Sequence, residues 1–156
     1  EAALDEVQRE VVFRVMKERQ FSSLLRPSDA DTRIFSGMNE VVETIQLTTK
    51  CLAGVFDDYL GRLGFQRPFL KMDTQGNDIR VAKGAGPHLS NFVGLQSELS
   101  FRQIYEEQDD YQAALDYYCS AGFLLSALVP NNPGHFPDLI EMDCIMYNSN
   151  FSLFSE

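Results

Sequence analysis

The 156-residue sequence has no tryptophan, only two histidines and three cysteines, and no long apolar run. A membrane-spanning helix needs roughly 18 consecutive apolar residues, so we expect none here. Cys51, Cys119 and Cys144 are widely spaced and form no C-x-x-C pair, so neither a zinc site nor a dithiol redox motif is indicated. Cys119 and Cys144 lie among apolar residues, which predicts small buried side chains and agrees with a reducing cytoplasm.

Basic residues are scarce, because 13 Lys and Arg stand against 23 Asp and Glu and give a formal net charge of −10. Such a surface repels phosphate backbones, so we expect no nucleic-acid partner. It is compatible with a cationic ligand. The first residues contain no basic segment followed by an apolar stretch, so no signal peptide is predicted and we expect a cytoplasmic protein. The length suits a single domain.

Local periodicity predicts the elements of the first half of the chain. Apolar residues alternate over residues 10–17 and again over 41–48, which indicates two strands. From Leu52 the apolar positions recur at helical spacing as far as Leu63, and Gly64 is placed to end that helix. The serine- and proline-containing residues between the two strands are expected to form a long loop.

The second half alternates strands with helices. Strands are predicted at 69–73, 92–99, 123–129 and 140–147, and helices near 78–83 and 111–121. Alternating strands and helices predict an α/β fold with a mostly parallel sheet covered by helices. The last two strands are joined by a proline-rich loop without a helical pattern, so we expect them to pair antiparallel.

Several strings carry a resemblance to a known family. The central one is F-L-K-M-D-T-Q-G-N-D at 69–78, followed by V-A-K-G-A at 81–85. The others are V-G-L-Q-S-E-L-S at 93–100, I-Y-E at 104–106, G-F at 122–123, E-M-D at 141–143 and F-S-S-L-L at 21–25. In this order and spacing the chain resembles the FkbM-type methyltransferases that use S-adenosylmethionine.

The resemblance implies a Rossmann-like methyltransferase sheet, mostly parallel with its last strand antiparallel. It also implies S-adenosylmethionine as cofactor and methylation of a hydroxyl on a small molecule or glycan. One departure matters: such enzymes begin with a strand and a glycine-rich turn that grips the cofactor. The nearest candidates, Gly54 and the G-A-G string at 84–86, lie in the wrong order.

This departure shapes the domain prediction. The resemblance places Glu1 after the family's first strands, so we expect residues 1–156 to be one partial methyltransferase domain whose N-terminal strands are missing. We expect such a chain to be inactive by itself and to belong to a longer polypeptide. The exposed sheet edge would then be covered by the missing segment or by self-association. The alternative is a non-catalytic α/β interaction module that has lost cofactor binding.

Two carboxylates at strand ends are the first candidate site residues. Asp73 ends a buried strand, where the family implies contact with cofactor and acceptor; otherwise it caps the turn. Gln75 follows in the same turn and is a second candidate for cofactor binding. Glu98 lies in an apolar run where burial of a carboxylate is costly, so it needs either a partner or a place in an active site. Lys71 is the candidate partner, and a structural ion pair is the other interpretation.

His135 is the candidate general base, because its ordinary pKa of about 6.5 suits proton removal from a hydroxyl. An exposed loop histidine is the simpler interpretation. A metal site formed by Asp73, Glu98 and His135 is not supported by any ligand spacing, so we expect no metal. Catalysis by this set would rest mainly on alignment of the two reactants.

Overall fold

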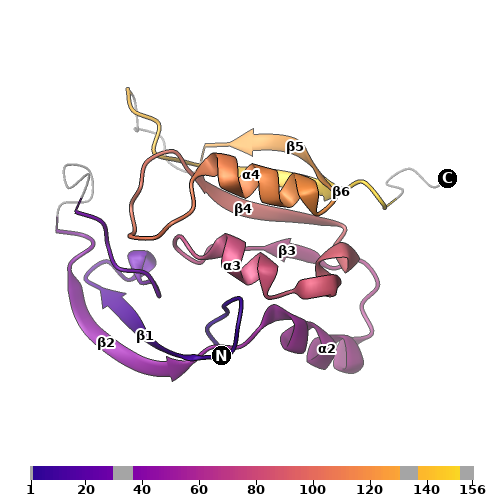
Figure 1. The fold of residues 1–156 in the computed structure, drawn as a ribbon, viewed down its shortest axis with the longest axis horizontal. Helices are drawn as coiled ribbons and strands as arrows, with labels where there is room; N and C mark the ends of the chain where they lie inside the picture. The colour runs from indigo at the N-terminus through magenta and orange to yellow at the C-terminus, as the bar shows by residue number, and fades with distance from the viewer. Residues whose placement is uncertain (1, 30–36, 131–136, 152–156) are drawn as a thin grey trace.

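The computed structural model describes residues 2–29, 37–130 and 137–151. Within them, β1 (Glu10–Met16) and β2 (Val41–Thr48) pair antiparallel, with Glu10 opposite Thr48. These bounds agree with the two alternating segments. The pair forms a two-stranded sheet of its own and does not join the main sheet, a separation that the sequence did not predict. Figure 1 shows this hairpin beside the helices α2 and α3.

The main sheet has four strands in the order β3-β4-β6-β5. They are β3 (Phe69–Lys71), β4 (Gly94–Ser100), β5 (Phe123–Val129) and β6 (Glu141–Asn148). β3 and β4 are parallel, while β6 is antiparallel to both β4 and β5. Three strands therefore run one way and the last strand runs the other, as expected for this sheet. Within the described residues, β3 and β5 lie at the two edges of this sheet.

The helices are α2 (Leu52–Leu63), α3 (Asp78–Lys83) and α4 (Tyr111–Ser120), with short 3-10 turns at Arg19–Phe21 and Gly86–Asn91. Gly64 ends α2 in the left-handed conformation at φ 63°, and its N–H donates to the Leu60 carbonyl. This is the cap that the sequence predicts. Only the first half of the apolar stripe of α2 is buried. Leu52 and Phe56 are buried, whereas Leu63 near the end of the helix is 69% exposed.

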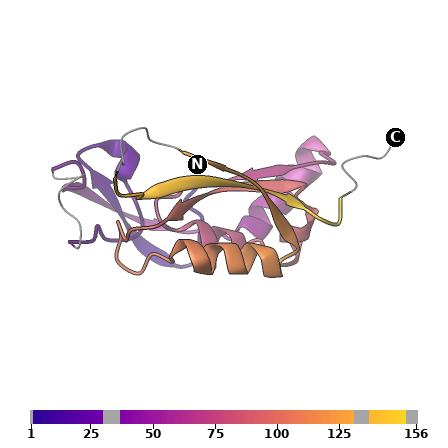
Figure 2. The same cartoon turned by 90° about the horizontal axis from the view of Figure 1, so that it is seen from above.

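One face of the main sheet is covered by α3 and α4. Ser97 in the middle of β4 donates to Asp78 at the start of α3 and contacts the Tyr118 hydroxyl of α4, so both helices pack on the same face. Figure 2 shows α4 on one side of the β5–β6 ribbon. Because side chains alternate along a strand, the neighbours of Ser97 point to the opposite face. That face carries the site.

The main core lies between the sheet and these helices. Its fully buried members include Leu95, Leu99, Phe123 and Met146. Cys144 belongs to it as predicted, but Cys119 is exposed on α4, so its predicted burial is wrong. The apolar neighbours of Cys119 in the sequence point to other sides of the helix.

A second cluster joins the hairpin to the main sheet. It consists of buried side chains from β1, the segment after it, the segment after β4 and the residue that precedes β6: Met16, Leu25, Ile104, Tyr105 and Ile140. This cluster fixes the loop after β1 against the end of the main sheet. In the described part of the chain, no helix has the length and apolar character needed to cross a bilayer.

Candidate functional site

The strand register brings Asp73 next to Glu98. Lys71 is paired with Gln96 in the parallel β3–β4 ladder, and the Met72 N–H donates to the Gln96 carbonyl over 2.9 Å. Extending this register by two residues places Asp73, just after β3, beside Glu98 of β4, and the charge of Asp73 acts on the Glu98 carboxyl. Glu98 belongs to the sheet face opposite the one that Ser97 presents to the helices. The two carboxylates predicted from the sequence therefore lie near each other.

The turn after β3 is held by side chains from distant segments. Gln75 adopts a positive φ of 53° and donates from Nε2 to Asp73 Oδ1 over 3.0 Å. Its backbone carbonyl accepts a hydrogen bond of 2.7 Å from the Ser23 hydroxyl, and its Oε1 accepts one of 2.8 Å from the Tyr105 hydroxyl. A left-handed conformation in a non-glycine residue is costly, so these contacts maintain the turn. They orient Gln75 and, through it, Asp73.

Asp78 connects this turn to β4. Its carboxylate accepts from the Thr74 N–H and hydroxyl, from the Ser97 hydroxyl at 2.9 Å and from the Glu98 N–H at 3.0 Å. Asp78 is buried, and all four of these hydrogen-bond donors are groups of the same chain. Its role is therefore to hold Thr74 and Glu98 in place, in keeping with its position in the first turn of α3.

The half-buried Glu98 and the buried Glu141 form a pair of carboxyl groups. Ser100 is opposite Glu141 and Glu98 is opposite Asp143, so the four side chains cluster where β4 ends and β6 begins. Burial, helped by the negative charges of Glu141, Asp73, Asp78 and Asp143, raises the pKa of Glu98 to about 8. Burial and the charges of Asp73, Asp143 and Asp78 outweigh the lowering effect of a hydrogen bond with Glu98 and raise the pKa of Glu141 to about 7.

The charges around the pair explain why a proton is retained. Glu141 Oε1 is buried without a hydrogen-bond partner, a costly arrangement for an ionised carboxylate. Asp143 accepts a hydrogen bond of 2.8 Å from Gln96 on the same face. With pKa values near neutrality, the pair can share one proton and can both donate and accept it. In the described part of the chain, Glu98 and Glu141 are the only two carboxyl groups that we identify as sharing a proton in this way.

Tyr105 completes the polar side of the site. Its ring is fully buried, and its hydroxyl lies 2.8 Å from Gln75 Oε1 and 3.0 Å from the Phe21 carbonyl. Burial raises its pKa, and the nearby Glu141, Glu98 and Asp73 raise it further. Tyr105 therefore remains a neutral hydrogen-bond donor at physiological pH.

The structure brings some of the predicted site residues together and leaves one undescribed. Asp73, Gln75 and Glu98 lie together on one part of the sheet. Lys71, the predicted partner of Glu98, forms an ion pair with Asp73, in which Nζ and Oδ2 are 3.3 Å apart. His135 lies outside the described residues, so its role stays a prediction from the sequence. Across the described residues, no three His, Cys, Asp or Glu side chains are arranged to hold a metal ion.

Sequence reasoning did not assign a role to Glu141 or Tyr105. Glu141 belongs to a strand more than forty residues after Glu98, and antiparallel pairing alone brings the two together. A signal was present: Glu141 and Asp143 alternate with apolar residues, which places two carboxylates on one strand face. Tyr105 follows β4 within the string at 104–106, but no local pattern indicates its contact with Gln75.

Comparison with known proteins gives one match. The family model described as Methyltransferase FkbM domain matches residues 5–125, which include β1 to α4 and the start of β5. A search of curated proteins and a search of solved structures each found no match. The matched span contains Asp73, Gln75 and Glu98, whereas Glu141 follows it.

Proposed function

We propose, because the chain belongs to the family of FkbM methyltransferase domains, that it takes part in methyl transfer from S-adenosylmethionine to a hydroxyl group. The acceptor in this proposal is a small molecule or a glycan. The observation that carries it is that Asp73, the first acidic residue of the string at 69–78, lies near the paired carboxyls of Glu98 and Glu141, whose pKa values its charge raises. We propose the Rossmann-like class for the main sheet on the same grounds.

The acidic cluster is chemically suited to the cofactor. S-adenosylmethionine supplies an electrophilic methyl group on a positively charged sulfonium. Negative charge at Asp73 and partial negative charge on the Glu98–Glu141 pair favour a cation at this face of the sheet. We assign Asp73 and Gln75 to cofactor contact, since both lie in the turn that follows β3, where the Asp73 side chain is exposed. The described residues supply no glycine-rich turn for the rest of the cofactor, so this wall is one part of a binding site.

Each residue has a role in this proposal. Asp73 positions the acceptor hydroxyl, and Gln75 holds Asp73 in orientation through its 3.0 Å hydrogen bond. S-adenosylmethionine would supply the methyl group, and the acceptor hydroxyl would give up its proton to a base on this chain as its oxygen is methylated. Glu98, which is hydrogen-bonded to Glu141, is suited to accept that proton because the pKa values of both carboxyls lie near neutrality. His135 is a second candidate for this base.

A methyl-transfer assay with Asp73→Asn tests this proposal. The protein translated from the whole coding sequence is incubated with methyl-labelled S-adenosylmethionine and hydroxylated acceptors. We expect Asp73→Asn to lower turnover roughly 100-fold or more, because loss of one positioning or charge-stabilising group costs about that much. Melting temperature should remain close to that of the wild type, because the Asp73 side chain is 58% exposed.

Asp116→Asn is the matched control, because Asp116 is an exposed aspartate on α4, away from the β3–β4 tips. It should leave turnover unchanged. Equal turnover in Asp73→Asn and wild type would remove Asp73 from the reaction. A wild-type protein that transfers no methyl group and does not bind S-adenosylmethionine would contradict the proposed activity and support a non-catalytic module.

A further inference from the structure

A second candidate site lies between the hairpin and α3. A cavity of about 510 Å³ is bounded by β1, the segment after it, α3 and the segment after β4. Cavities that bind small molecules are typically about 300–1,000 Å³. The cavity is lined by Arg9, Glu10, Val11, Val12, Arg14, Leu24, Leu25, Arg26, Arg80, Glu106 and Glu107. Four arginines thus line one cavity in a chain whose net charge is −10: two at β1, one in the segment after it and one in α3.

Two of these arginines are fixed by contacts within the protein. Arg9 forms an ion pair of 2.7 Å with Asp5, whose side chain is 1% exposed, and Nε donates to the same carboxylate. Arg14 Nη1 donates to the Leu24 carbonyl over 2.6 Å and to the Val12 carbonyl over 3.2 Å. Neither guanidinium uses all five of its donors in these contacts. They give the cavity a preformed wall of guanidinium donors, in which Asp5 offsets the charge of Arg9 and Arg14 donates to neutral carbonyls.

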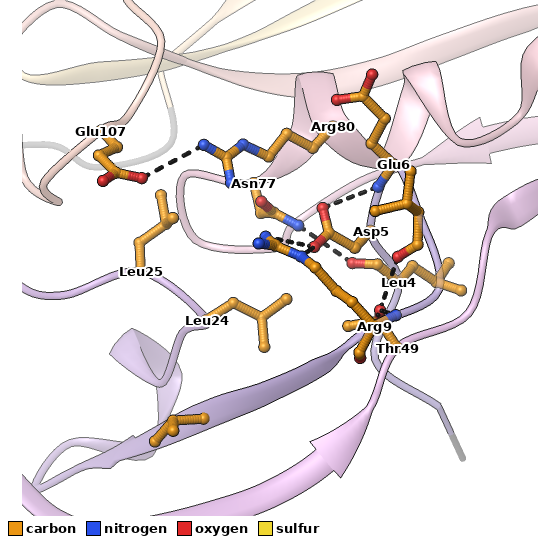
Figure 3. Close-up of polar contacts among 12 residues, drawn as sticks. Leu4, Asp5, Glu6, Arg9, Leu24, Leu25, Thr49, Asn77, Arg80 and Glu107 are labelled. Atoms are coloured by element: carbon orange, nitrogen blue, oxygen red, sulfur yellow. Dashed lines mark hydrogen bonds and ion pairs between the residues drawn. The ribbon is translucent and has the colours of Figure 1, made fainter.

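The other two arginines are available to a ligand. Arg26 makes no ion pair with any residue in the described ranges 2–29, 37–130 and 137–151. Arg80 has one long ion pair of 3.5 Å, with Glu107, whose side chain is 77% exposed. Figure 3 shows Arg9 and Arg80 converging from different elements on the space beside Leu24 and Leu25.

The edge of β1 adds a backbone donor. Arg14 exchanges backbone hydrogen bonds with Ser23 and not with β2. In an antiparallel strand, alternate residues direct their backbone groups to the same side, so the N–H of Val12 also faces away from β2. Val12 lines the cavity. An oxyanion held there would meet a backbone N–H as well as guanidinium groups.

We propose that this cavity binds a hydroxylated small molecule that carries an oxyanion, either a carboxylate or a phosphate. Arg26 and Arg80 recognise the oxyanion by charge-assisted hydrogen bonds. The exposed carboxylates of Glu10, Glu106 and Glu107 accept hydrogen bonds from hydroxyl groups, and Val11, Leu24 and Leu25 contact the apolar parts of the ligand. This mixture of side chains fits an acidic sugar better than a bare inorganic ion.

The cavity adjoins the turn that carries Asp73. Leu25 lines the cavity, and its Cδ1 would lie 3.1 Å from a β-carbon placed on Gly76. The neighbouring Ser23 donates to the Gln75 carbonyl. We therefore assign the ligand as the methyl acceptor, a step that rests on the proposed function. The binding site itself does not depend on that step.

Calorimetric titration of the 156-residue chain in the absence of S-adenosylmethionine tests the site. The probes are glucuronate for the carboxylate, glucose 6-phosphate for the phosphate and glucose as the neutral counterpart. We expect saturable binding of at least one acidic sugar with a dissociation constant on the order of 1 mM or lower, and no saturable binding of glucose. Arg26→Gln and Arg80→Gln should each weaken binding about tenfold or more.

Arg67→Gln is the matched control, because it removes the same charge from an exposed position outside the cavity. It should bind the acidic sugar as the wild type does. Equal weakening by Arg67→Gln and Arg26→Gln would reduce the effect to overall charge and overturn the proposal, as would equal binding of glucose. Absence of saturation by both acidic sugars up to about 50 mM would also overturn it. None of these results bears on Asp73→Asn turnover, so the two proposals fail separately.

Discussion

Glu98 and Glu141 give the site its dependence on pH. The pKa of Glu98 is raised from 4.5 to about 8 and that of Glu141 to about 7, in both cases mainly by burial. Between pH 4.5 and these values, the folded protein therefore keeps protons that the unfolded chain has already released. By linkage, the stabilisation from these two groups is complete below pH 4.5 and is lost as the pH rises through 7 and 8.

Replacement of Glu98 by glutamine should remove much of this dependence. The amide stays neutral at every pH and avoids the cost of an ionised carboxylate among Glu141, Asp73 and Asp143. We expect Glu98→Gln to raise the free energy of unfolding by roughly 1–3 kcal/mol at pH 8.5 and to change it little at pH 5. Denaturant titrations at the two pH values measure this difference.

Glu43→Gln provides the comparison, because Glu43 is exposed on β2. It should leave the pH dependence of unfolding unchanged. If Glu98→Gln and the wild type lost stability in parallel from pH 5 to 8.5, the raised pKa of Glu98 would be refuted.

At the scale of elements, the turn from β3 to α3 depends on one glycine. Gly76 has a φ of 89°, and a β-carbon there would lie 3.0 Å from the Tyr105 ring and 3.1 Å from Leu25. Gly76→Ala therefore strains the backbone and pushes on two buried side chains. We expect it to lower the free energy of unfolding by about 1–3 kcal/mol. Denaturant titration measures the change.

Gly54→Ala is the matched substitution in a different setting. Gly54 is an exposed helical residue of α2, and a β-carbon there would have nothing within 4 Å. Alanine should stabilise α2 by roughly 0.5–1 kcal/mol. The account of the turn would be wrong if both alanine variants shifted stability in the same direction by similar amounts.

Local patterns predicted the elements well, and long-range pairing much less. β2 and α2 have the predicted bounds, 41–48 and 52–63, because alternation and helical spacing are properties of neighbouring residues. The separation of β1 and β2 from the main sheet depends on contacts between distant segments. The exposed second half of the α2 stripe has the same origin, since amphipathic spacing shows which side is apolar and not what covers it.

At the scale of the whole molecule, the site is assembled from four distant segments. Asp73 and Gln75 follow β3, Glu98 lies in β4, and Glu141 begins β6. Ser23, from the segment after β1, reaches the Gln75 carbonyl and joins the hairpin to the main sheet. The sequence identified Asp73, Gln75 and Glu98 because they belong to recognisable strings. It could not show their mutual orientation or the role of Glu141, which follow from strand order.

The proposed site requires that the charge of Asp73 acts on the Glu98 carboxyl. A carbon-13 NMR titration of the Glu98 carboxyl in wild type and Asp73→Asn measures this coupling directly, with Asp116→Asn as control. We expect a wild-type pKa near 8 for Glu98. In Asp73→Asn it should fall by roughly half a pH unit or more, because a neighbouring negative charge is removed. An unchanged pKa in Asp73→Asn, or a wild-type value near 4.5, would contradict a shared site.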